Sequence, residues 1–212
     1  ARGNDGQYDL HLFTLPQNPS DPVITRGRVR AKSTDCSDLV NNLVNHAMNG
    51  NAELRNGDDY ADPFMTVGLN LLRQAAAPFD FHPMEGSGFK PELYSGGQNS
   101  DLYRHIYGMA GGTLVGDRYV AFGLEIPGGQ VRARTGTEFV QRQMAQDRRD
   151  ALVTPTGATE VRDNLAGITI GNLMSSGIAG SINEGSLRRQ IYDILCDRPS
   201  KYPSRPNNTV RP

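Results

Sequence analysis

Residues 100–112 of the chain read Ser-Asp-Leu-Tyr-Arg-His-Ile-Tyr-Gly-Met-Ala-Gly-Gly. A polar cap followed by apolar residues at helical spacing predicts a helix from Asp101 to about Leu114. On that helix Asp101 and His105 are four residues apart and share one face, which Gly108 continues. Because glycine has no side chain, another backbone or a ligand can approach this face closely. The stretch therefore predicts a helix with an Asp–His pair beside a site of close approach.

Five further helices are predicted around this one, each from a capping residue followed by apolar side chains at intervals of three and four. Their expected ranges are 35–48, 63–72, 135–151, 160–175 and 184–196. With 24 glycines and 13 prolines these helices should be short and separated by turns. The fold class expected is mainly α, a compact domain of several short helices with an extended or β-hairpin N-terminal segment.

The chain divides into three expected parts. Residues 1–33 should form the extended or β N-terminal segment, because prolines interrupt any helix there. Residues 34–198 should form the helical domain, and 199–212 a proline-rich tail. The hydrophobic content of 37% is sufficient for one core.

The charge balance argues against nucleic-acid binding, and the distribution of apolar residues argues against a membrane span. Twenty-two basic and 23 acidic residues leave a net charge of −1, so no global field attracts nucleic acid. No apolar run approaches the roughly 20 residues that span a bilayer. We therefore expect neither nucleic-acid binding nor a membrane span.

Two cysteines, Cys36 and Cys196, lie near opposite ends of the predicted helical domain. They either form a disulfide or remain as two separate buried thiols, and only their distance in the fold decides between these alternatives. A bridge over so long a loop would stabilise the fold by roughly 4–5 kcal/mol in the chain-entropy model.

A second polar face lies on the helix predicted for residues 160–175. Asn164, Gly167 and Gly171 follow one another at helical spacing and form a small, polar stripe that can dock against the Asp101–Leu114 helix. A buried Asn164 would need its amide hydrogen-bonded there, which would determine how the two helices pair. Asp147 lies in the charged run 147–150, where it is either solvated or turned inward one turn after Met144.

Several familiar signatures are missing from the sequence. There is no GxSxG elbow, no GxxxxGK[ST] phosphate loop, no HExxH zinc motif and no CxxC pair. No metal site is predicted, and the sequence names no cofactor.

The motifs Asp101-Leu102-Tyr103-Arg104-His105 and Asp163-Asn164-Leu165-Ala166-Gly167 together resemble a pattern in the C-terminal domains of bacterial RHS/YD-repeat surface proteins. The segment 88–93 and the Leu195-Cys196 ending are also similar to the RHS-associated variants. The resemblance covers roughly residues 36–196. Many such domains are toxins delivered to rival cells, so the resemblance implies an exported, secreted or cell-surface effector. It also implies a parent RHS-type chain or self-association, and no leader of the domain's own.

Carried over, the pattern implies a site made of Asp101, Arg104, His105, Asp163, Asn164 and Gly167. Related sequences often carry an acidic residue with a histidine in the intervening helix, whereas this chain has Asp147-Arg148-Arg149 there. That departure puts a shared metal site or acid–base pair in doubt.

Two functions remain open from the sequence. In the first, the chain is a hydrolase in which His105 is the general acid/base, Asp101 orients it, and Asn164 polarises the substrate. Arg104, Asp163, Gly108 and Gly167 would then bind the substrate. In the second, the chain is a non-enzymatic extracellular structural or adhesive module whose two ends are contact arms and whose cysteines form a staple.

Overall fold

The computed structural model describes residues 7–13, 24–30, 35–53, 62–76, 88–94, 102–125 and 132–197. Within these ranges the chain is mainly helical, as predicted, and it has seven helices and two antiparallel strand pairs. The proline-rich tail lies outside the described residues, as do parts of the N-terminal segment.

The helices are α1 (Cys36–Glu53), α2 (Pro63–Ala76), α3 (Pro91–Tyr94), α4 (Leu102–Val115), α5 (Gly136–Asp150), α6 (Pro155–Ile178) and α7 (Glu184–Leu195). The strands are β1 (Gln7–Phe13), β2 (Ile24–Arg30), β3 (Tyr119–Glu125) and β4 (Arg132–Thr135).

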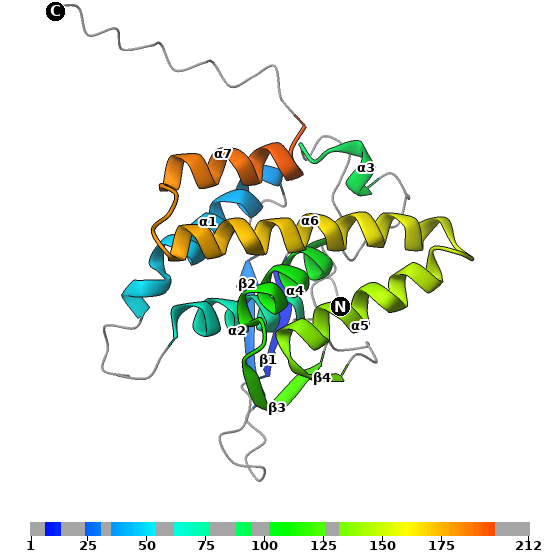
Figure 1. The fold of residues 1–212 in the computed structure, drawn as a ribbon, viewed down its shortest axis with the longest axis horizontal. Coiled ribbons are helices and arrows are strands. Elements are labelled where there is room, and N and C mark those ends of the chain that lie inside the picture. The colour runs from blue at the N-terminus through cyan, green and yellow to red at the C-terminus, as the bar shows by residue number, and fades with distance from the viewer. Residues whose placement is uncertain are drawn as a thin grey trace, which may run out of the picture.

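Helix α4 lies at the centre of the helical body and packs most extensively against α2 and α6, with α5 also in contact (Figure 1). Glycines permit the short distances between these helices. A Cβ built on Gly111 of α4 would lie 2.7 Å from the carbonyl oxygen of Gly68 in α2. A Cβ on Gly171 of α6 would lie 2.9 Å from the carbonyl oxygen of Ala110. Side chains at these positions would force the helices apart, so the glycines are required for the packing.

The buried apolar residues form two groups. The larger group joins α1, α2, α4, α6 and α7, and includes Leu43, Leu71, Ile106 and Ile191. The smaller group lies where α4 and α5 meet the β3–β4 hairpin, and Phe139 is its largest fully buried side chain. Because α4 contributes to both groups, its position is determined from two sides.

Local capping places the helix ends. Asp35 accepts the N–H of Asp38 (2.9 Å) at the start of α1, and Asp62 accepts that of Phe64 (2.9 Å) at the start of α2. In the capping box predicted at α5, Thr135 accepts the N–H of Glu138 (3.1 Å), whereas Glu138 accepts the N–H of Arg134 rather than that of Thr135.

Three helices are longer than predicted. Helix α2 continues to Ala76, four residues beyond the expected end at residue 72. Helix α1 continues through Asn49-Gly50 to Glu53, five residues beyond the expected end at residue 48. Helix α6 begins at Pro155 instead of residue 160, because Thr154 caps it and accepts the N–H of Gly157 (3.1 Å). The resulting α6 is 24 residues long and spans the body.

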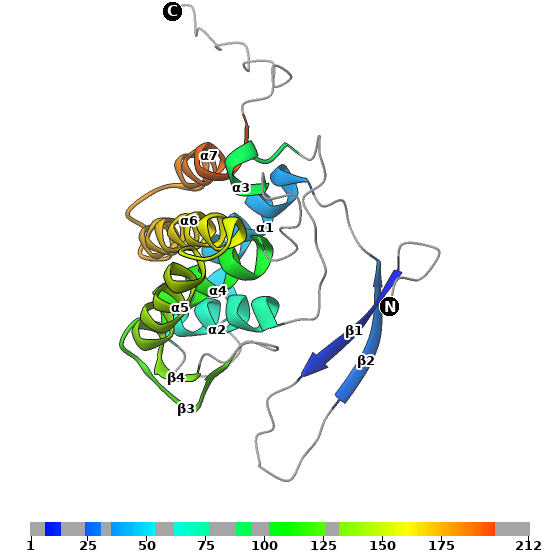
Figure 2. The same cartoon turned by 90° about the vertical axis from the view of Figure 1, so that its right-hand side faces the viewer.

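The strands form two separate hairpins. β1 pairs with β2 from Gln7↔Arg30 to Phe13↔Ile24, and Figure 2 shows this hairpin standing apart from the helices. The sequence did not predict β3–β4, where Gly123 has a φ of +74° beside a shift of register. It also missed the single-turn helix α3, which lies in a stretch expected to be a loop.

Cys36 and Cys196 form a disulfide with a Cα–Cα distance of 5.7 Å, which settles the alternative that the sequence left open. The bond joins the first residue of α1 to the residue after α7, and Phe89 pairs with Cys196 in an isolated β-bridge. Three distant segments therefore meet at one point. No helix in the described ranges is both long enough and apolar enough to cross a membrane.

Candidate functional site

His105 of α4 reaches across to α6. Its Nδ1 donates a hydrogen bond to Oδ1 of Asn164 at 2.7 Å. The His105 side chain is 10% exposed, whereas Asn164 is fully buried. The two polar faces that the sequence singled out thus meet at these two residues.

Asn164 joins His105 to a carboxylate on a third helix. Its Nδ2 donates to Oδ2 of Asp147 in α5 at 2.5 Å, and Gln143 donates to both Asp147 oxygens at 3.0 and 2.9 Å. Asp147 is 2% exposed. These four side chains, which we call the His105 network, link α4, α5 and α6.

The hydrogen bonds determine which ring nitrogen of His105 carries the proton. The amide nitrogen of Asn164 faces the Asp147 carboxylate, so its carbonyl oxygen faces His105, and Nδ1 must be the donor. Oδ2 of Asp147 lies 3.6 Å from the same Nδ1. No residue that the structure describes hydrogen-bonds to Nε2. In the neutral ring Nε2 therefore holds a lone pair that can accept a proton.

Gly167 brings α6 close enough for this contact. A Cβ at Gly167 would lie 2.7 Å from Met109 Cβ and 3.0 Å from the carbonyl oxygen of His105. The backbone of α4 itself occupies the space above Gly167, so the close approach is between helices. The sequence had assigned Gly167 to substrate binding, and the structure places it at the α4–α6 crossing.

The other predicted site residues fall in different surroundings. Asp101, the expected partner of His105, lies outside the described residues, and Asp147 holds the carboxylate position in the network. Asp163 is fully buried in α6, Gly108 is buried in α4, and Arg104 is half-buried on α4. The structure brings together His105 and Asn164 from the predicted set, and adds Asp147 and Gln143.

One sequence signal pointed to the missed residues. Gln143 and Asp147 are four residues apart on a polar helix, and Asp147 follows Met144 by three, which places it near the buried face. Sequence alone left Asp147 between solvent and interior, because a charged run usually faces water.

Two tyrosines of α4 lie close to His105 in the sequence. Burial raises the pKa of the Tyr107 hydroxyl well above its usual value, and burial raises the pKa of Tyr103 too, with Tyr107 adding to the effect. The rings of Tyr103 and Phe89 meet edge to face with centroids 5.9 Å apart. Both hydroxyls stay protonated at neutral pH, so neither tyrosine supplies a base.

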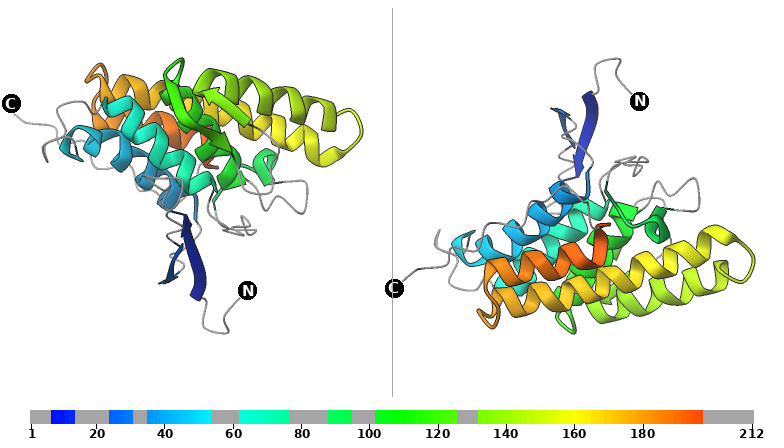
Figure 3. Two further views of the ribbon diagram at one scale, coloured as in Figure 1. Left: turned by 90° about the horizontal axis from the view of Figure 1, so that it is seen from below. Right: turned by 90° about the horizontal axis from the view of Figure 1, so that it is seen from above.

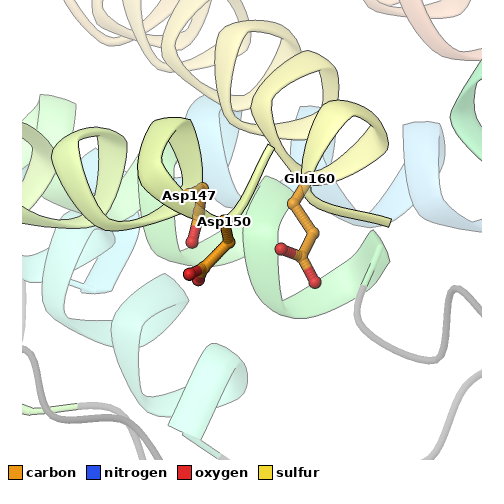
Figure 4. A group of neighbouring side chains, drawn as sticks. All are labelled: Asp147, Asp150 and Glu160. Atoms are coloured by element: carbon orange, nitrogen blue, oxygen red, sulfur yellow. The ribbon is translucent and has the colours of Figure 1, made fainter. Parts of the chain in front are cut away.

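Three carboxylates gather where α5 ends and α6 begins. Asp147, Asp150 and Glu160 each place an oxygen within 4.8 Å of the others (Figure 4). They are the described side chains whose spacing could accommodate a metal ion. Asp147 already accepts hydrogen bonds from Gln143 and Asn164, and Asp150 is exposed, so we assign no metal to this cluster.

No family model, no curated protein and no solved structure matches this chain.

Proposed function

We propose that the chain is a hydrolase of the exported bacterial effector class, in which His105 is the general acid/base. The supporting observation is the bonded series from Asp147 through Asn164 to Nδ1 of His105. It fixes the tautomer and ring orientation and leaves the lone pair of Nε2 available. Asp147 and Asn164 are positioning residues in this proposal, and Asp147 takes the role that was predicted for Asp101.

The proposed reaction needs one proton transfer in each direction. Nε2 takes a proton from a water molecule as the water oxygen attacks the electrophilic carbon or phosphorus of an ester or amide. The resulting imidazolium, stabilised by the nearby Asp147 carboxylate, then returns the proton to the leaving group as its bond breaks. Removing such a base typically lowers the rate by about 10²–10⁴-fold.

We propose further that the chain acts outside the cytoplasm, at the cell surface or after secretion. The support is the Cys36–Cys196 disulfide, since such bonds persist mainly in oxidising environments. The resemblance of the two motifs to RHS/YD-repeat proteins is consistent with this location, and it suggests a parent RHS-type chain as the carrier.

A second candidate function is a non-enzymatic structural or adhesive module. It is favoured by the burial of Asn164 and Asp147, because a buried polar network also specifies helix pairing. In that case His105 contributes only to stability. Its replacement lowers the melting temperature, and neither the parent nor the variant has hydrolytic activity.

The test compares the parent chain with His105→Asn, whose amide nitrogen can replace Nδ1 as the donor to Asn164 but cannot transfer protons. Each protein is sent to the periplasm of a bacterial host, and colony counts are measured. The purified proteins are assayed on chromogenic esters, phosphodiesters and amides. We expect the parent to be toxic and hydrolytic, and the variant to lose about 10²-fold or more of the hydrolysis rate with little change in melting temperature.

His46→Gln is the matched control. His46 is also half-buried on a helix and accepts an amide hydrogen bond from Gln74 at 2.7 Å, but that bond belongs to α1 and α2 and not to the His105 network. The control should keep full toxicity and hydrolysis. A parent chain without either activity, or a His105→Asn variant as active as the parent, would reject the enzyme in favour of the structural module.

A further inference from the structure

The turn between α5 and α6 carries two adjacent apolar side chains in water. Leu152 is 85% exposed and Val153 is 79% exposed. Among the described residues only Tyr119 and Leu165 are further large hydrophobic side chains with high exposure, and neither is adjacent to another of them in the chain. An adjacent, outward pair is therefore a local feature of this turn.

The turn is well ordered by hydrogen bonds. Leu152 N–H donates to the Arg149 carbonyl at 3.1 Å, and Val153 N–H donates to the Asp150 carbonyl at 3.0 Å. A Cβ on Gly157 would lie 2.4 Å from the Ala151 nitrogen, so α6 packs directly against the turn. The backbone donors are satisfied internally, and the two apolar side chains are held outward.

The turn is also the most protruding point of the α5–α6 pair. Figures 1 and 3 place it at the end of the two helices, beyond the other described helices. A convex tip with two apolar side chains cannot bury the roughly 800 Å² per partner that a stable protein interface requires. A lipid bilayer, by contrast, can surround a convex tip and accept apolar side chains about 5–10 Å below the headgroup surface.

Two arginines beside the tip can contact the phosphates of a lipid surface. Arg148 and Arg149 are exposed on the last turn of α5, and their long side chains can reach lipid phosphates while Leu152 and Val153 insert. Asp150, Glu160 and the buried Asp147 offset these two arginines, so the tip has no net positive charge and insertion depends on the apolar pair. We propose that the α5–α6 turn docks the chain on a phospholipid bilayer through Leu152 and Val153.

This docking would bring the His105 network close to the lipid headgroups. Ala151 N–H donates to the Asp147 carbonyl at 2.8 Å, which places Asp147 one helical turn from the tip. Asp147 is in turn bonded to Asn164, the partner of His105. With the proposed function, on which this step rests, the substrates within reach of His105 are the ester bonds of membrane lipids.

The absence of tryptophan from the chain permits a direct test. Two variants with one tryptophan each are compared. Leu152→Trp places the fluorophore at the tip. Leu165→Trp places it at a 49% exposed site on α6, about 15 Å along the helix from its start. Both are titrated with vesicles of three parts phosphatidylcholine and one part phosphatidylglycerol. We expect the tryptophan emission to shift to the blue, and to be quenched by brominated lipid, in the Leu152→Trp variant only. An equal shift at both sites, or none at residue 152, would overturn the docking proposal.

A flotation assay with the same vesicles measures binding of the chain without a probe. Leu152→Asp combined with Val153→Asp alters only exposed side chains, and should lower the bound fraction about tenfold or more. A doubly substituted chain that binds like the parent would contradict docking by the tip. A dimer that forms without vesicles and is lost in this variant would instead identify a second copy of the chain as the occupant.

Lipid release separates the two proposals. His105→Asn should bind vesicles like the parent but release no fatty acid or headgroup from them. If the parent binds vesicles through the tip and hydrolyses soluble esters but no lipid, docking stands and the lipid substrate class is rejected. If the parent binds vesicles and hydrolyses nothing, docking stands and the proposed function fails.

Discussion

At the scale of the residue, Asn164 is the side chain through which three helices are joined. Its carbonyl oxygen accepts a hydrogen bond from His105 and its amide nitrogen donates one to Asp147, so both polar ends of the amide are hydrogen-bonded. An amide is suited to this position because it offers a donor and an acceptor at once. A carboxylate at residue 164 would face Asp147, and an apolar residue would leave both neighbours without a partner.

Replacing Asn164 with leucine should therefore cost more than its change in size suggests. The buried Asp147 carboxylate loses a hydrogen bond and Nδ1 of His105 loses its acceptor, for a destabilisation of about 2–4 kcal/mol. Urea unfolding followed by circular dichroism measures the difference. Asn172→Leu, on the exposed side of the same helix, should change stability by no more than about 0.5 kcal/mol. Equal effects of the two substitutions would show that the network does not stabilise the fold.

At the scale of the element, the α4–α6 crossing determines the geometry of the site. The two helices approach closely because Gly167 and Gly171 of α6 face the backbone and small residues of α4. The separation between the helices sets the distance from His105 to Asn164. A change in helix packing should therefore appear as a change in the site as well as in stability.

Gly167→Ala tests this coupling. The added methyl group would lie 2.7 Å from Met109 Cβ and must push the helices apart, with a net cost of about 1–3 kcal/mol. We expect lower stability in urea and a lower rate of any hydrolysis that depends on His105. Gly185→Ala in α7 is the matched control, because nothing but an ordinary contact at 3.6 Å lies near its Cβ. That substitution should raise stability by up to about 1 kcal/mol through helix propensity.

At the scale of the whole molecule, the disulfide ties the two ends of the helical domain together. It closes a separation of 160 residues, and the chain-entropy model assigns such a closure about 4–5 kcal/mol. Domains of this kind have a total stability of about 5–15 kcal/mol. One covalent bond therefore contributes a large share of a stability in that range.

We expect the Cys36→Ala, Cys196→Ala double variant to lose several kcal/mol of unfolding free energy, within the range of about 2–5 kcal/mol known for disulfides. The parent chain treated with reductant should show a similar fall in its urea midpoint, and the double variant should not respond to reductant. A parent midpoint unaffected by complete reduction would show that helix packing alone holds α1 and α7 together.

Features that depend on near neighbours in the chain were predicted from the amino-acid sequence. Caps at Asp35, Asp62 and Thr135 and apolar stripes at helical spacing are interactions within a few residues, and most of the helix positions follow from them. The β3–β4 hairpin and the single turn of α3 were missed, because such short elements are stabilised by packing against the body more than by their own residues.

Contacts between distant residues depend on how the helices pack and did not follow from the sequence. His105 and Asn164 are 59 residues apart, Asn164 and Asp147 are 17 apart, and the cysteines are 160 apart. Local pattern marked His105 and Asn164 as polar positions on close-packing faces, but it could not show that Asp147 turns inward to join them. The physical reason is that a helix pattern specifies which face is buried, while the crossing of α4, α5 and α6 specifies which buried groups share a hydrogen bond.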